Sequence, residues 1–188
     1  MRTGQPVGAE ALVRWNHPER GLLTPDSFIE LAEETGLIKP LGDWILEEAC
    51  RHWHGWQPIG SAPLRLAINL TDRQFRNQTL VSDIGQVLDR TGLPAECLEL
   101  ELTESLLMQN AASAGRVLQQ LKELGVQLSI DDFGTGYFSL AYLQNLPIDR
   151  LKIDPSFVHG GPGDHGHASI VTTIIDLARN HRLQLIAE

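Results

Sequence analysis

The sequence predicts an α/β fold in which parallel β-strands are joined by helical crossovers. Six short apolar runs alternate with longer segments of helical periodicity along 188 residues, a length sufficient for one domain and its core. Parallel neighbours need crossovers of about a dozen residues or more, so this alternation indicates a parallel sheet. The pattern fits both a barrel and an open, doubly wound sheet. No glycine-rich phosphate loop follows the first runs, which disfavours a dinucleotide-binding sheet.

The predicted strands are short and rich in aliphatic residues. The third strand alternates leucine with glutamate, which is the period-two pattern of a β-strand. In chain order, strands are expected at residues 7–13, 64–70, 98–102, 126–130, 150–153 and 184–186.

Helices are expected between these strands, and several begin or end at typical residues. The segment Thr24-Pro25-Asp26-Ser27 predicts a helix start with proline in the first turn, and Gly36 ends that helix. Gly92 and Gly125 are expected to end two later helices. The helices are expected at residues 28–34, 41–54, 80–91, 112–124 and 168–180. The glycine-rich residues 159–167, which include three histidines, predict a mobile loop in preference to a metal site.

The composition narrows the possible classes of function. Hydrophobic residues make up 42% and charged residues 21%, values typical of a soluble globular protein and not of a disordered or disulfide-rich chain. The net charge of -9 disfavours DNA as a partner and suits a site for divalent cations. Two distant cysteines, no signal peptide and no apolar run of membrane-spanning length predict a cytoplasmic location. The chain is equally compatible with the cytoplasmic part of a membrane-anchored protein.

Polar residues stand at the ends of successive predicted strands. The C-terminal ends of parallel strands meet at one edge, so these residues are expected to converge there. Any one acid alone is equally explained as a solvated strand end or a helix cap, and for Glu99 or Asp154 alone we favour that explanation. Asn69 alone fits a strand-end cap as well as it fits a ligand. The series comprises Glu10, Asn69, Glu101, Asp131, Asp132, Lys152, Asp154 and Glu188.

Converging carboxylates repel one another unless cations compensate them. Hard oxygen ligands suit Mg²⁺ or Mn²⁺, and the adjacent Asp131 and Asp132 are well placed to share a pair of metals. Paired metals activate water against phosphate esters, and Lys152 beside them is expected to orient the water or offset developing charge. Gly134 and Gly136 predict a mobile loop over the site.

The motifs resemble those of EAL domains, the cyclic di-GMP phosphodiesterases. Glu10-Ala11-Leu12 with Val13-Arg14-Trp15 resembles the signature of that family. The resemblance continues in family order through residues 28–37, 69–71, 101–104, 131–137, 151–154 and 186–188. Phe138 and Pro155 depart from the family pattern in the loops that follow two of these motifs.

The resemblance implies a modified TIM (β/α)8 barrel whose first strand is antiparallel to the rest. Residues 1–188 are then one EAL domain, incomplete at both ends, without the first strand and the last β/α unit. It also implies hydrolysis of cyclic di-GMP to linear pGpG in bacterial second-messenger signalling. Two Mg²⁺ or Mn²⁺ ions are implied as cofactors, with Ca²⁺ expected to inhibit.

The resemblance also implies a role for each matching residue. Glu10, Asn69, Glu101 and Asp131 hold one metal, and Asp131, Asp132 and Glu188 hold the second. Glu10, Lys152 and Glu188 are the implied catalytic residues, with Lys152 on the attacking water. Leu12, Arg14 and Asp154 bind substrate, Arg14 towards a phosphate. Glu104 stabilises the loop at residues 132–140.

Two alternatives to the enzyme remain at the level of sequence. The first is a catalytically inactive cyclic di-GMP receptor of the same fold, disfavoured because the acids between Glu10 and Glu188 are all present. The second is a different metal-dependent TIM-barrel hydrolase, disfavoured by the ordered motifs. The implied partners are cyclic di-GMP, a second copy in a homodimer, and a fused sensory or GGDEF-type domain.

Overall fold

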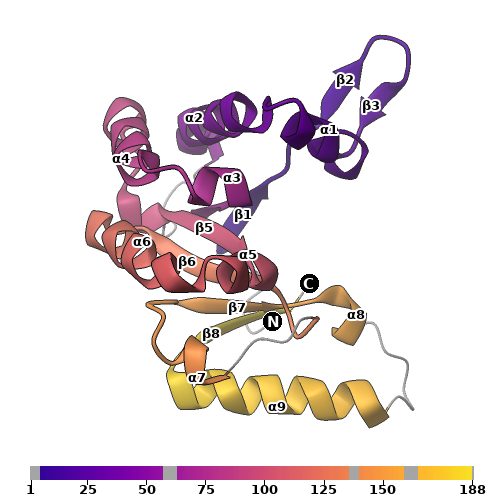
Figure 1. Cartoon of the computed structure of the whole chain (residues 1–188), viewed down its shortest axis with the longest axis vertical. Coiled ribbons are helices and arrows are strands. Elements are labelled where there is room, and N and C mark those ends of the chain that lie inside the picture. The colour runs from indigo at the N-terminus through magenta and orange to yellow at the C-terminus, as the bar shows by residue number, and fades with distance from the viewer. Residues whose placement is uncertain (1–4, 57–62, 136–139, 159–164, 188) are drawn as a thin grey trace. The chain divides into compact units, whose positions relative to one another are not determined.

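The computed structural model describes residues 5–56, 63–135, 140–158 and 165–187 (Figure 1). The chain forms two compact units, Met1–Glu99 and Leu100–Glu188, which are described one at a time. The boundary falls inside strand β5 (Leu98–Thr103), so each unit contains part of that strand.

The first unit contains two parallel strands and a hairpin. Strand β1 (Gly8–Ala11) pairs with β4 (Arg65–Asn69), with Glu10 opposite Ala67. Strands β2 (Trp15–His17) and β3 (Gly21–Leu23) form the antiparallel hairpin, which was not predicted. Its turn requires a positive φ of 72° at Gly21, a conformation that glycine adopts without strain. The hairpin lies beside α1 (Ile29–Glu34), and the rings of Trp15 and Phe28 meet edge to face at 5.8 Å (Figure 1).

The helices of this unit begin and end at residues whose chemistry explains the boundary. The helix α2 (Ile38–Trp56) begins earlier than predicted, because Pro40 is tolerated in its first turn. The helix α4 (Leu80–Thr91) has the predicted bounds and ends at Gly92 with φ 69°. A capping box of Thr71 and Gln74 begins α3 (Asp72–Phe75) directly after β4. The short 3-10 turns are η1 (Pro25–Ser27) and η2 (Ala95–Cys97).

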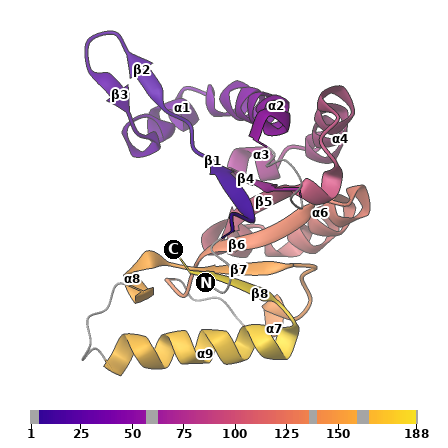
Figure 2. The same cartoon turned by 180° about the vertical axis from the view of Figure 1, so that it is seen from behind.

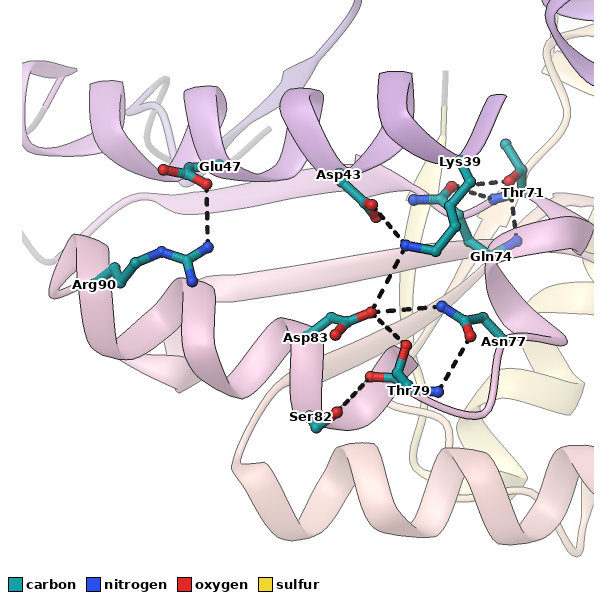
Figure 3. Close-up of polar contacts among 10 residues, drawn as sticks. All are labelled: Lys39, Asp43, Glu47, Thr71, Gln74, Asn77, Thr79, Ser82, Asp83 and Arg90. Atoms are coloured by element: carbon teal, nitrogen blue, oxygen red, sulfur yellow. Dashed lines mark hydrogen bonds and ion pairs between the residues drawn. The ribbon is translucent and has the colours of Figure 1, made fainter. Parts of the chain in front are cut away.

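Charged side chains join α2 to α4 along their exposed sides (Figure 3). Lys39 lies 2.7 Å from Asp43 on its own helix and 3.9 Å from Asp83 on α4. Further towards the C-terminal end of α2, Glu47 accepts a hydrogen bond of 3.1 Å from Arg90 of α4. These pairs are exposed and contribute little each, so the packing of buried side chains carries the contact between the helices. Buried residues of the two helices include Leu46, Cys50, Trp53, Ile84, Val87 and Leu88.

The second unit is a parallel sheet with helices between its strands. Strand β6 (Gln127–Phe133) pairs in parallel with β7 (Arg150–Ile153), and β7 pairs in parallel with β8 (Gln184–Ala187). Figures 1 and 2 both show α9 (His165–His181) alongside β7 and β8. Every residue of β7 is buried, as expected for a strand covered on both faces. The other helices are α5 (Glu104–Gln109), α6 (Ala111–Leu124), α7 (Leu140–Leu143) and α8 (Pro155–Val158).

The order of the strands confirms the predicted fold class. In the first unit the hydrogen-bonded order is β1-β4-β5, and in the second it continues from β5 through β6 and β7 to β8. Every parallel strand therefore neighbours the next one along the chain, with no reversal of order. A doubly wound sheet has such a reversal at its switch point, whereas a TIM-type sheet has none. The six-stranded order fits a TIM-like barrel of which these strands form part.

Two further details differ from the sequence-based expectation. The short helices α3, α5, α7 and α8 were not predicted, because four to six residues are too few to show a helical period. Residues 165–167, expected in a mobile loop, instead form the start of α9, while residues 159–164 lie outside the described residues. Within the described ranges, none of the helices is both long enough and apolar enough to cross a membrane.

Candidate functional site

The first unit brings together two of the predicted site residues. Glu10 is near the end of β1, and Asn69 is the last residue of the neighbouring β4. Asn69 Nδ2 donates a hydrogen bond of 2.7 Å to Glu10 Oε1, and both residues are exposed. The expected convergence of strand-end polar groups is therefore present in this unit. A carboxylate beside an amide presents oxygen atoms suited to a hard cation.

The chain leaves Asn69 through a rigid turn. Thr71 accepts the N–H of Gln74 through its hydroxyl, and the Gln74 amide oxygen accepts both the N–H and the hydroxyl of Thr71. Gln74 is buried and packs against Gly42 of α2, where a Cβ atom would collide with its side chain. The absence of a side chain at Gly42 thus lets α3 approach α2 directly behind Asn69.

Hollows in the first unit flank the segment that follows Glu10. A cavity of about 320 Å³ is lined by Leu12, Asn69 and Thr71 among others. A second, of about 400 Å³, is lined by Glu10, Leu12, Arg14 and Trp44 among others. Leu12 is 53% exposed, and the Arg14 side chain is exposed and donates to the Val13 carbonyl at 2.8 Å. Leu12 and Arg14, two of the three residues predicted to bind substrate, are therefore accessible to a ligand.

The second unit brings a lysine between two carboxylates. Lys152 Nζ lies 2.9 Å from Glu101 Oε1 and 3.3 Å from Asp131 Oδ1. The side chains of Lys152, Glu101 and Asp131 are 4%, 2% and 13% exposed. The three residues come from β7, β5 and β6, so the strands of the sheet supply one group each. Burying ionised groups is costly unless they are paired, and here the opposite charges meet directly.

A β-bulge produces the unusual position of the two aspartates. Ile130 pairs with Leu151 and Phe133 with Ile153, so both Asp131 and Asp132 lie opposite Lys152. A bulge places two residues opposite one and redirects their side chains. Asp132 has a positive φ of 54°, and its N–H donates to Asp131 Oδ1 at 3.0 Å. Asp131 is thereby directed towards Lys152, while Asp132 is exposed.

Asp154 follows β7 and caps the short helix α8. The N–H of Ser156 donates to Asp154 Oδ1 at 2.7 Å. Hydrogen bonds from the Ser156 hydroxyl and then the Ser156 N–H hold the pKa of Asp154 below its ordinary value, and Asp132 contributes to the same shift. Asp154 is therefore ionised at neutral pH, and its side chain interacts with Asp132 of β6.

Glu104 contacts the beginning of the loop after β6. Its side chain is buried, and Oε2 accepts the N–H of Gly134 at 3.4 Å. This contact involves the first part of the loop that Glu104 was expected to stabilise. The rest of the loop at residues 136–139, which includes Phe138, lies outside the described residues, as does Glu188.

The donor set of the second unit fits a hard divalent cation. Glu101, Asp131 and Asp132 offer only carboxylate oxygens, and Lys152 offsets one of their three formal charges. Among the described residues, no three histidine, cysteine, aspartate or glutamate side chains already gather as a metal-binding group. The carboxylate oxygens of Glu101, Asp131 and Asp132 are therefore the right kind of ligand for such a cation, although their present spacing does not form a metal-binding group.

Two contributors near the site were not predicted from the sequence. Ser156 binds Asp154, and the order Asp154-Pro155-Ser156 carried a usable signal, because aspartate before proline is a typical helix start. Phe157 contacts the loop after β6 at Gly134, and nothing in the spacing of the sequence indicated that contact.

Comparisons with known proteins show which family and which relatives this chain resembles. The EAL domain family matches residues 1–188. The cyclic di-GMP phosphodiesterase NbdA of Pseudomonas aeruginosa is 47% identical over 188 residues, covering 100% of this chain and 24% of that protein. The bifunctional diguanylate cyclase/cyclic di-GMP phosphodiesterase MucR of the same species is 45% identical over 185 residues, covering 98% and 27%. The chain thus spans about a quarter of the length of these relatives.

Solved structures show the same fold at substantial identity. The PaMucR phosphodiesterase in complex with c-di-GMP matches with a TM-score of 0.91 and 45% identity, over 96% of this chain and 73% of that one. The EAL domain of Mycobacterium smegmatis DcpA matches with a TM-score of 0.80 and 36% identity, over 100% and 75%. The match along the whole sequence and the shared fold lead to one conclusion: the chain belongs to the EAL domain family.

Proposed function

We propose that this chain hydrolyses one phosphodiester bond of cyclic di-GMP and releases linear pGpG. The observation that carries the proposal is the buried contact of Lys152 with Glu101 and Asp131. Buried charges at the ends of parallel strands are costly for stability and are typical of active sites. The names of NbdA and MucR, both cyclic di-GMP phosphodiesterases, support the choice of substrate.

The proposed cofactor is Mg²⁺ or Mn²⁺. We propose Glu101, Asp131 and Asp132 of the second unit and Glu10 and Asn69 of the first as oxygen ligands, with Glu188 completing the set. A bound divalent pair supplies an activated water at neutral pH and offsets negative charge on the phosphate. The neutral amide of Asn69 limits the total charge of the ligands.

The chain's own residues have distinct roles in this proposal. Lys152, held between two carboxylates, keeps an ammonium group in place to orient the attacking water. Arg14 is exposed beside Leu12 and presents a guanidinium to a substrate phosphate. Asp154, ionised at neutral pH, is a hydrogen-bond acceptor for the nucleotide. Glu104 orders the start of the loop after β6 through the N–H of Gly134.

We also propose the setting in which the domain works. MucR combines phosphodiesterase and diguanylate cyclase activities in its name, which supports a sensory or GGDEF-type domain as the neighbour of this chain. A homodimer and a cytoplasmic location are further parts of the proposal, and DNA is disfavoured by the net charge of -9.

The test is a turnover assay with cyclic di-GMP and Mg²⁺, followed by chromatography for pGpG. Glu101→Gln removes one carboxylate charge with little change in shape, and we expect it to lower kcat by about 100-fold or more. Glu123→Gln is the matched control, because Glu123 is exposed on α6 outside the cluster.

The outcomes separate the enzyme from a receptor. Product formed by the wild type and by Glu123→Gln, but not by Glu101→Gln, supports the proposal. Tight binding of cyclic di-GMP without any product would instead identify the chain as a catalytically inactive receptor.

A further inference from the structure

The β-bulge that carries the two aspartates ends at a tightly held residue. Gly134 has a φ of 106° and lies two positions after Asp132, whose φ is also positive. Glycine adopts a positive φ without strain, whereas the positive φ of Asp132 is costly unless neighbouring groups fix it. Gly134 follows the strained Asp132 by only two residues, so groups that fix Gly134 also restrict the backbone of the bulge.

Side chains from two helices occupy the space where a side chain at Gly134 would begin. A Cβ atom at this position would lie 3.0 Å from Phe157 Cε2 and 3.3 Å from Ile174 Cδ1. These values are shorter than ordinary van der Waals contact, so the ring of Phe157 already fills the space beside the Gly134 backbone. Glu104 binds the N–H of the same residue at 3.4 Å.

Phe157 is in turn anchored to the strand that carries Lys152. Its N–H donates to the carbonyl of Asp154 at 3.1 Å, directly after the end of β7. Asp154 also accepts the N–H of Ser156, which closes the first turn of α8. The ring of Phe157 thus connects β7 with Lys152 to the end of the bulge with Asp131 and Asp132.

We infer that Phe157 is a positioning residue, which sets the relation between Lys152 and the aspartate pair through its contact with Gly134. The inference rests on the proposed function, because the aspartates are its proposed metal ligands. Loss of the ring frees Gly134 and allows the bulge to relax. Cation binding then weakens, and catalysis falls although Phe157 touches neither metal nor substrate.

The first experiment measures cation binding directly, without any nucleotide. Mn²⁺ is titrated into the 188-residue chain, and free Mn²⁺ is followed by electron paramagnetic resonance. We expect Phe157→Ala to weaken binding about tenfold, and Phe157→Leu to recover most of that loss. Val158→Ala is the matched control, since Val158 is exposed on the same short helix and is expected to bind as wild type.

Turnover provides a second measurement. A purely structural role for Phe157 would not lower kcat while leaving KM nearly unchanged. We expect Phe157→Ala to lower kcat about tenfold or more and to leave the KM for cyclic di-GMP within about twofold. A folded Phe157→Ala protein with wild-type Mn²⁺ affinity and kcat would overturn the inference. So would a wild-type chain that binds no Mn²⁺.

A second pair of variants decides the case if Phe157→Ala does not fold. Gly134→Ala places a methyl group against the same ring, at a φ of 106° that alanine rarely adopts, and is expected to weaken Mn²⁺ binding. Removal of the ring relieves only the collision and not the backbone strain, so we expect a smaller loss in the Phe157→Leu background. If the losses of Mn²⁺ affinity in the two single variants simply add in the double variant, the ring and Gly134 act independently and the inference is overturned. A wild type that binds Mn²⁺ without cleaving cyclic di-GMP refutes the proposed reaction alone, and the Mn²⁺ titrations still decide the role of Phe157.

Discussion

Lys152 shows how one residue can serve both stability and chemistry. Its ammonium group is buried with Glu101 and Asp131, and removal of one partner from such a group leaves uncompensated charge in a place that water reaches poorly. The same geometry would keep the ammonium group fixed during a reaction. Measurements of stability and of turnover on one variant therefore report different properties of the same contact.

We predict that Lys152→Met lowers the free energy of unfolding by about 3 kcal/mol in the absence of divalent cations. Urea denaturation of the variant and the wild type in the presence of EDTA measures this difference in the free energy of unfolding. The control is Lys39→Met, because Lys39 pairs with Asp43 at 2.7 Å with side chains 46% and 49% exposed. The control is expected to cost less than about 1 kcal/mol. Equal losses in the two variants would contradict the importance of burial at Lys152.

Cys50 and Cys97 are free and buried, which makes them chemically inert in the folded chain. Burial raises the pKa of the Cys50 thiol to about 12, with Glu47 adding to the effect, and burial also raises the pKa of Cys97. Because the thiolate is the reactive form, we predict slow reaction of both with a disulfide reagent at about pH 8. Adding denaturant should expose two fast thiols, and fast reaction of the native protein would contradict the prediction.

The raised pKa of Cys50 also makes the stability of the folded chain depend on pH in the alkaline range. The folded chain holds the Cys50 proton more tightly than the unfolded chain, whose thiol has a pKa near 9.0. The resulting stabilisation is complete below about pH 9 and is lost as the pH rises towards 12.

At the scale of elements, glycine residues in α2 illustrate how packing overrides helix propensity. A methyl group at Gly42 would collide with the buried Gln74 side chain, which caps α3 behind Asn69. At Gly55 of the same helix nothing lies within 4 Å of the added atom. Replacement of glycine by alanine is therefore expected to lower the stability of the chain at Gly42 and to raise it at Gly55.

We predict that Gly42→Ala destabilises the chain by about 1–3 kcal/mol, because a close-packed site must move. Gly55→Ala is expected to stabilise it slightly through the helix propensity of alanine, by less than the roughly 0.5–1 kcal/mol of a helix interior, because Gly55 is the penultimate residue of α2. Thermal melting of the two variants and the wild type checks both signs. A melting temperature raised by Gly42→Ala would contradict the close approach of α2 and α3.

The comparison of expectation with structure is also clearest for elements. The predicted strands agree with β1 and β4 to β8 within a few residues, because buried parallel strands leave short apolar runs in the sequence. The bulge at Asp131 and Asp132 could not be predicted, since it depends on the register of β6 against β7. The pair of Glu10 and Asn69 was predictable from strand ends, whereas the ring of Phe157 against Gly134 depends on packing between helices and a loop.

At the scale of the whole molecule, the net charge of -9 favours cation binding over any contact with nucleic-acid backbones. Acidic residues outside the proposed site account for most of this charge, so it attracts cations generally and does not select among them. Selectivity for a catalytic metal must come from the number and spacing of the oxygen ligands.

We therefore predict that Ca²⁺ inhibits Mg²⁺-dependent turnover by competition. Mg²⁺ requires an octahedral set of oxygens at about 2.0–2.1 Å, whereas Ca²⁺ accepts six to eight ligands at about 2.3–2.6 Å and would hold the aspartates and the substrate less closely. The assay follows pGpG formation at fixed Mg²⁺ while Ca²⁺ is increased, and then restores Mg²⁺ in excess. We expect the rate to fall and then to recover, with NaCl at matched ionic strength as the control. Undiminished turnover in excess Ca²⁺ would contradict the predicted competition and would count against a catalytic pair of hard cations bound by Asp131 and Asp132.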